Sequence, residues 1–151
     1  MADVVTEETR SRMMSGIRGK DTKPELVVRK ALFAAGFRFR LHRRDLPGAP
    51  DVVMAGRRVA VFVHGCFWHR HKGCRLAAVP ATRPEFWKAK LDGNAARDIK
   101  NIGSLRALGW RVLVVWECAL RDRKTLDGLP GILGEWVRGD ETEGELRGAP
   151  R

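Results

Sequence analysis

The spacing of apolar residues changes along the chain, and each change predicts a different element. Apolar positions at helical spacing predict a helix over residues 22–36, opened by Thr22 and Glu25 as a capping box. Alternating apolar and basic positions predict a strand over residues 37–41. Short apolar runs predict strands at 51–54 and 58–63, joined as a hairpin. In such a hairpin Asp51 and Val63 lie near the same end of neighbouring strands.

The second half of the chain continues this pattern with longer elements. A second capping signature, Thr82 with Glu85, predicts a helical region that reaches Gly109 and that the Asp-Gly-Asn run at 92–94 could interrupt. An apolar run at 110–116 predicts a buried strand, and residues 129–137 predict a last helix. Helix-separated strands beside a hairpin indicate an α/β fold, with a mixed central sheet flanked by helices.

The net charge of the chain indicates what kind of partner it binds. The 151 residues are enough for one domain, and the net charge of +11 with a pI near 10.6 indicates an anionic partner, with nucleic acid the first candidate. No apolar run is long enough to cross a bilayer, and residues 1–20 contain no signal segment. We therefore expect no membrane contact and a reducing, cytoplasmic location.

Composition also divides the chain. Residues 1–20 are polar and basic, and predict an arm that contacts the nucleic acid. Residues 21–137 hold all the predicted elements and predict the folded domain. Residues 138–151 are glycine-rich with four acids, and predict a flexible tail without a role in anion binding.

Residues 64–74 hold three of the four histidines and two of the three cysteines. One loop could present Cys66, His71 and Cys74 to a single ion, and Cys118, at the end of a buried strand, could complete the set. Three thiolates and an imidazole form a typical structural zinc site. His69 could replace His71, because spacing alone does not decide between them.

Carboxylates and imidazoles near the same strand ends predict a second metal site. Asp51 follows a proline-rich turn at a strand start, which is where metal-dependent nucleases place a Mg²⁺ ligand. The usual acid-x-Lys motif is absent, which leaves a backbone carbonyl such as that of Val63 as a further ligand. His69 and His64 could order or deprotonate a water, since a neutral imidazole suits a general base. Glu25 could reach the same site or serve only the helix cap.

Aromatic side chains stand beside the cations of this region. Phe67, Trp68 and Trp87 flank the metal-ligand loop and predict rings that stack on bases or wedge between them. Trp110, Trp116 and Phe86 are expected in the core.

Five stretches together resemble the very short patch repair (Vsr) endonucleases, which belong to the restriction-endonuclease-like superfamily. The stretches cover roughly residues 9–120: residues 9–11, 46–51, 63–69, 79–87 and 108–118. The family nicks one DNA strand 5′ of the thymine in T:G mismatches, which arise when 5-methylcytosine deaminates. This resemblance implies a restriction-endonuclease-like core over residues 21–137, acting as a monomer on double-stranded DNA in the bacterial cytoplasm, with nucleoid association and contact with other mismatch-repair proteins as further expectations.

Residue roles follow from the same resemblance. It implies Mg²⁺ held by Asp51 and the Val63 carbonyl, and His69 as general base. His64 and Glu25 support waters at the metal. The resemblance further implies structural zinc held by Cys66, His71, Cys74 and Cys118, and DNA intercalation by the three rings Phe67, Trp68 and Trp87.

Two positions depart from the family pattern. Family members usually carry Thr at the position of Val63, and one residue rather than two between the ligands His71 and Cys74. Two other functions stay open from the sequence: a zinc-stapled DNA-binding module without catalysis, and a related nuclease with another DNA target.

Overall fold

The computed structural model describes residues 21–148, so the arm expected over residues 1–20 lies outside the described residues. A five-stranded sheet forms the centre, in the order β1-β2-β3-β4-β5. The first three strands are antiparallel neighbours, whereas β3–β4 and β4–β5 are parallel pairs. The strands are β1 (Arg40–Leu41), β2 (Val52–Met54), β3 (Val59–His64), β4 (Arg111–Trp116) and β5 (Glu143–Leu146).

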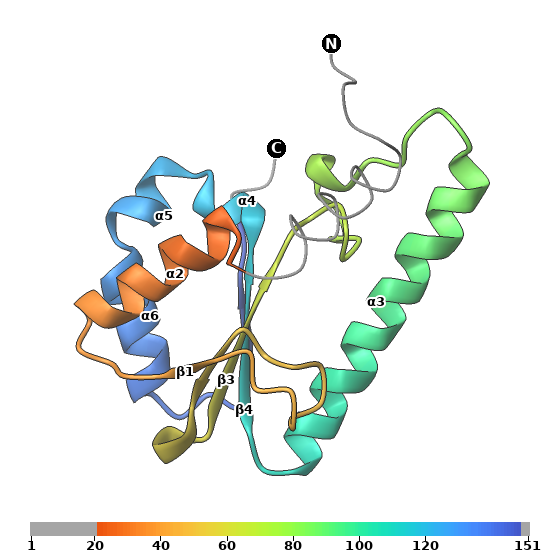
Figure 1. Cartoon of the computed structure of the whole chain (residues 1–151). Coiled ribbons are helices and arrows are strands. Elements are labelled where there is room, and N and C mark those ends of the chain that lie inside the picture. Colours follow the sequence, from red (N-terminus) through yellow and green to blue (C-terminus); the bar gives the residue numbers. More distant parts are fainter. Residues whose placement is uncertain (1–20, 149–151) are drawn as a thin grey trace, which may run out of the picture.

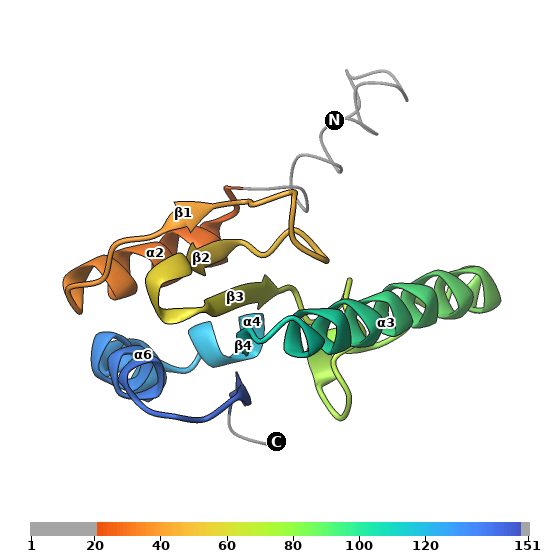
Figure 2. The ribbon, with the colours of Figure 1, turned by 90° about the horizontal axis from the view of Figure 1, so that it is seen from below.

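Helices cover the sheet unequally. On one face lie α2 (Lys23–Ala34) and α6 (Leu129–Arg138), with α5 (Arg123–Asp127) beside them, while α3 (Pro84–Ala107) lies on the other face (Figure 1). Successive sheet residues therefore alternate between two cores: Val61 packs with the α2 and α6 residues, whereas Phe62 packs with Leu105 of α3. The view from below separates these layers (Figure 2). Short helices complete the fold: the 3-10 helices η1 (Ala55–Arg57) and η2 (Arg75–Ala77) and the α-helix α4 (Glu117–Leu120).

This mixed α/β sheet confirms the fold class expected from the sequence, a restriction-endonuclease-like core. The capping box is present, because the Glu25 N–H donates to the Thr22 hydroxyl oxygen and that hydroxyl donates to the Glu25 carboxylate. The β2–β3 hairpin is also present, with η1 as its turn. Within the described residues, no helix is long and apolar enough to cross a membrane.

Three local expectations were wrong. Helix α3 runs without interruption through residues 92–94, and its N-cap is Arg83, in the left-handed region, rather than Thr82. The strand expected over 37–41 is reduced to Arg40–Leu41. Phe86 is 45% exposed and stacks under Arg83, so it is no core residue.

Part of the segment expected to be a tail belongs to the sheet. β5 pairs in parallel with β4, with Glu143 opposite Val112 and Leu146 opposite Val115. Leu146 packs against the core on the α2 and α6 side. This edge strand alternates exposed and half-buried positions, so it needs few apolar residues. Its low apolar content is the reason why the sequence did not predict a strand here.

Leu32→Ala should lower the free energy of unfolding by about 2–5 kcal/mol, because Leu32 is fully buried between α2 and the sheet. Leu26→Ala is the matched control in the same helix, where the side chain is 49% exposed, and should change stability by less than about 0.5 kcal/mol. Urea unfolding of both variants measures the difference. Equal effects would contradict the packing described for α2.

Candidate active site and metal cluster

The loop of residues 65–74 follows β3, and polar residues of α3 hold it from one side. Asn94 of that helix donates to the Trp68 carbonyl oxygen at 3.0 Å. Asp92 pairs with Arg70, with 3.3 Å between Oδ1 and Nε. The polar run at 92–94 that was expected to break the helix therefore contributes side chains that bind the loop.

A cluster of three thiols and one imidazole stands where this loop meets the end of β4. Nδ1 of His71 lies 3.5 Å from the sulfur atoms of both Cys66 and Cys118. The ligand atoms of these residues and of Cys74 all lie within 4.8 Å of one another. Metal–sulfur bonds of about 2.3 Å and metal–nitrogen bonds of about 2.0 Å give tetrahedral edges of about 3.5 Å, so the cluster fits a tetrahedral ion.

The sequence left His69 and His71 as alternative ligands, and the structure places His71 in the cluster. Its ring stacks on Trp116, with 3.8 Å between the centroids and 4° between the planes. Relative to the family pattern, this chain has one more residue between His71 and Cys74. A turn in which Gly73 has a φ of +71° accommodates it. The Cys74 N–H still bonds to the His71 carbonyl oxygen at 3.3 Å.

Residues near the C-terminal end of the described chain close the cluster. The Gly148 N–H donates to the Cys118 sulfur at 3.2 Å, and the Cys118 N–H donates to the Cys66 sulfur at 3.3 Å. A Cβ at position 148 would lie 2.6 Å from the Cys118 carbonyl oxygen, so only glycine fits there. Burial raises the pKa of the Cys66 thiol, and a bound cation would have to displace its proton.

Asp51 lies just before β2, and its carboxylate crosses to β3. Oδ2 accepts a hydrogen bond of 2.7 Å from the Val63 N–H, so the two residues lie together as the hairpin predicted. Burial raises the pKa of Asp51 from 3.8 to about 7, opposed by this hydrogen bond and increased by the charge of Glu25. Val63 is followed by His64, so Asp51 lies at the end of β3 that also carries the stacked rings of His64 and His69.

His69 is held by an acid that the sequence analysis missed. Its Nδ1 lies 2.6 Å from Oδ2 of Asp98 on α3. Its ring stacks on that of His64, with 3.8 Å between centroids and 5° between planes. Burial, with the charge of His69, holds the pKa of His64 well below its ordinary value, so His64 is neutral at pH 7. This trio borders a cavity of about 570 Å³, which gives His69 access to solvent.

Glu25 is engaged on both carboxylate oxygens. Oε1 accepts from the Asp21 N–H and from Arg29, each at 3.1 Å, and Oε2 accepts from the Thr22 hydroxyl. His42 lies between this group and Asp51: its Nε2 is 3.3 Å from Glu25 Oε1, and its Nδ1 is 3.8 Å from Asp51 Oδ1. Glu25 thus serves the helix cap and also lies one side chain away from Asp51.

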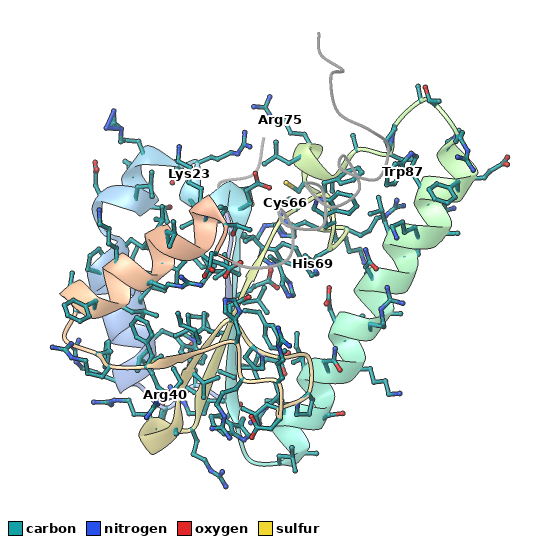
Figure 3. The ribbon with its side chains drawn as sticks, in the orientation of Figure 1. Lys23, Arg40, Cys66, His69, Arg75 and Trp87 are labelled. Atoms are coloured by element: carbon teal, nitrogen blue, oxygen red, sulfur yellow. The ribbon has the colours of Figure 1, made fainter. Side chains whose placement is uncertain are left out.

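The three predicted DNA-contacting rings form one cluster. Phe67 lies 5.0 Å from Trp68 and 5.7 Å from Trp87, centroid to centroid, and Trp68 lies 6.1 Å from Trp87. All three are half-buried rather than sealed in the core. Figure 3 places Trp87 at the start of α3, above His69 and Cys66 at the end of the sheet.

The sequence did not predict three residues that the structure places at the site: Asp98, Arg29 and His42. A signal existed for Asp98: it lies seven residues from each of the buried Leu91 and Leu105, so it interrupts the apolar stripe of α3 with a charge. A charge on a buried helix face requires a partner. Arg29 and His42 carry no such signal, because their meeting depends on how α2 packs beside β1.

The stability of the protein without added Mg²⁺ should depend on pH through Asp51. Its pKa is raised in the folded chain, so its ionisation destabilises the fold progressively as the pH rises from about 4 to about 7. Asp51→Asn removes this penalty. The gain in unfolding free energy of the variant over the wild type should therefore grow from pH 4 to pH 7 in urea titrations, then level off. A gain independent of pH would contradict the burial of this carboxylate.

Comparisons with known proteins agree with this geometry. The family described as "DNA mismatch endonuclease Vsr" matches residues 2–75. The DNA mismatch endonuclease Vsr of Escherichia coli (strain K12) is 45% identical over 148 residues, which cover 97% of this chain and 94% of that protein. The type II nicking enzyme V.XorIIP of Xanthomonas oryzae pv. oryzae is 49% identical over 127 residues, which cover 84% and 93%.

A third relative is the type II nicking enzyme V.NmeAIP of Neisseria meningitidis serogroup A, 43% identical over 123 residues, with 82% of this chain and 87% of that protein covered. The match to the Escherichia coli protein extends across nearly the whole chain. The chain therefore belongs to the Vsr family of DNA mismatch endonucleases, and it is a DNA endonuclease.

Proposed function

We propose that this endonuclease depends on Mg²⁺ and nicks one DNA strand 5′ of the thymine in a T:G mismatch. The observation that carries this proposal is the position of Asp51 at the end of β3, where the His64 ring stacks on His69 and Asp98 holds His69. The relatives, a mismatch endonuclease and nicking enzymes, support the same reaction class. The T:G preference comes from the family resemblance.

Asp51 and the Val63 carbonyl are the residues that would hold Mg²⁺, and the bound ion would supply positive charge to the phosphate. The chemistry of the donors fits: a largely buried carboxylate at the start of a strand is stabilised when a cation replaces its proton. Val63 serves as well as threonine here, because a carbonyl ligand is independent of the side chain. Glu25 and His64 would order the active-site water.

His69 is the proposed general base. A carboxylate can only accept, so the hydrogen bond to Asp98 places the ring proton on Nδ1 and leaves the Nε2 lone pair to take a proton from the attacking water. The neutral His64 ring stacked on His69 fixes the plane of that imidazole. These contacts position the base before DNA binds.

Mismatch selection is proposed for the ring cluster of Phe67, Trp68 and Trp87. A mismatched step unstacks at lower cost than a paired step, so ring insertion converts weak pairing into selectivity. Exposed cations on α3, Lys88, Lys90, Arg97 and Lys100, lie on the helix that carries Trp87 and can contact phosphates. The basic arm of residues 1–20 is proposed to contact the same DNA.

Zinc is the proposed ion of the cluster formed by Cys66, His71, Cys74 and Cys118. Four protein ligands leave no open position, so a bound ion would have a structural role and would fix the loop that carries His69. The bacterial relatives favour a cytoplasmic enzyme. Action as a monomer, nucleoid association and contacts with other repair proteins remain proposals from the resemblance.

A single duplex with T:G or C:G at one position tests the reaction. The wild type should nick the T:G duplex in Mg²⁺ and leave C:G uncut, and Asp51→Ala should lower the rate at least about 100-fold. Asp45→Ala is the matched control, since Asp45 is an exposed acid that pairs with Arg43, and it should retain the wild-type rate.

Other outcomes assign the remaining functions. Binding of the T:G duplex without any nicking by the wild type would favour a zinc-stapled DNA-binding module. Equal cutting of both duplexes would favour a nuclease with another target. A wild-type rate in Asp51→Ala would overturn the catalytic assignment.

Metal analysis of the purified protein should find about one zinc per chain, and Cys118→Ser should lose it because one of four ligands is removed. Gly148→Ala should release zinc faster to a chelator, since its Cβ would displace Cys118. Gly131→Ala, at a helical position with open space, should match the wild type. Retention of zinc in Cys118→Ser would contradict the proposed ligand set.

A further inference from the structure

One guanidinium nitrogen lies among three side chains that could ligate a metal ion. Arg29 Nη2 is 2.8 Å from Asp21 Oδ1, 3.1 Å from Glu25 Oε1 and 3.0 Å from His42 Nε2. The three surrounding atoms lie within 4.8 Å of one another. Arg29 and Glu25 are largely buried, with 14% and 4% of their side chains exposed.

The spacing of these atoms is close to that of ligands around a cation. His42 Nε2 is 3.3 Å from the Glu25 oxygen and 3.7 Å from the Asp21 oxygen. Ligands at about 2.1–2.2 Å from a divalent ion lie about 3.0–3.5 Å from one another. Two carboxylates and an imidazole are a donor set that suits Mn²⁺ and related ions.

The cage formed by Asp21, Glu25 and His42 contacts the nuclease site through His42. Arginine can only donate, so its contact places the lone pair of His42 on Nε2 and the ring proton on Nδ1. That Nδ1 is 3.8 Å from Asp51 Oδ1, and the His42 N–H donates to the Asp51 carbonyl oxygen at 3.2 Å. The orientation of His42 beside Asp51 therefore depends on Arg29.

We propose that Arg29 is a positioning residue of the nuclease site, and that its guanidinium stands where a second divalent cation would bind. The fixed positive charge offsets the buried Glu25 carboxylate and orients His42. This role rests on the proposed function of Asp51. It predicts that loss of the guanidinium opens a cation site of Asp21, Glu25 and His42.

Mn²⁺ titration followed by electron paramagnetic resonance tests the cage without catalysis. Arg29→Met should bind one Mn²⁺ more per chain than the wild type, and Arg29→Lys should bind the wild-type number. Arg123→Met, which removes an exposed charge on α5, controls for net charge and should add no site. Arg29→Met combined with His42→Gln should lose the additional ion. An unchanged Mn²⁺ count in Arg29→Met would overturn the proposal.

Nicking of the T:G duplex gives the second measurement. Arg29→Met should lose about tenfold or more in rate in Mg²⁺, while Arg29→Lys should stay within about threefold of the wild type. Mn²⁺ should restore most of the rate of Arg29→Met, with a midpoint equal to that of the additional site. A merely structural residue would show the same loss with both ions, and that result would overturn the proposal.

Failure of the wild type to nick would contradict the proposed function alone. The Mn²⁺ count would still show whether loss of the Arg29 guanidinium opens a cation site. Circular dichroism checks that each variant is folded. Arg29→Gln, which is polar and of similar length, replaces Arg29→Met if that variant is unfolded, and the same Mn²⁺ counts then decide.

Discussion

The position of a ten-residue loop without regular structure decides whether this site exists. Residues 65–74 carry the proposed base His69 and two of the three clustered rings, yet they pair with no strand. Their backbone must be held by tertiary contacts, and these come from two sides. The cluster of Cys66, His71, Cys74 and Cys118 binds the loop to the end of β4, and the polar residues of α3 bind it from the other face. An ion in the cluster would make this arrangement rigid, which is what a base aligned to within a fraction of an ångström requires.

Charge is distributed in this protein on two length scales. The net charge of +11 attracts DNA over distances of about a Debye length, near 10 Å. Within the site the predominant charge is negative, because three acids lie near the strand ends: Asp51, Glu25 and Asp98. Each of these acids has a specific partner, a backbone N–H for Asp51, a guanidinium for Glu25 and an imidazole for Asp98. A basic surface thus brings the phosphate to a place where negative side chains can share a cation with it.

Much of this could be predicted from the sequence, because the signals were local. The capping box, the hairpin, the buried strands and the cysteines of the cluster follow from spacing along the chain, whereas spacing left His69 and His71 as alternatives. The failures concern residues whose role is set by distant partners. Asp92 and Asn94 looked like a helix break because their loop partners are not visible in the sequence, and β5 was hidden because an edge strand needs few apolar residues. Asp98 could have been recognised as a charge within the apolar stripe of α3, whereas nothing in the sequence distinguishes Arg29 or His42.

The span of the cysteine cluster has a consequence for how the protein is made. Cys66 and Cys118 are separated by 52 positions, and Gly148 follows after another 30. At about 5–20 residues per second, the ribosome adds the last ligand about 3–10 s after the first. During that interval the nascent chain exposes two thiols and an imidazole that no fourth ligand has joined. A truncated translation product that ends before Cys118 would therefore lack the contacts that bind residues 65–74 to the end of β4.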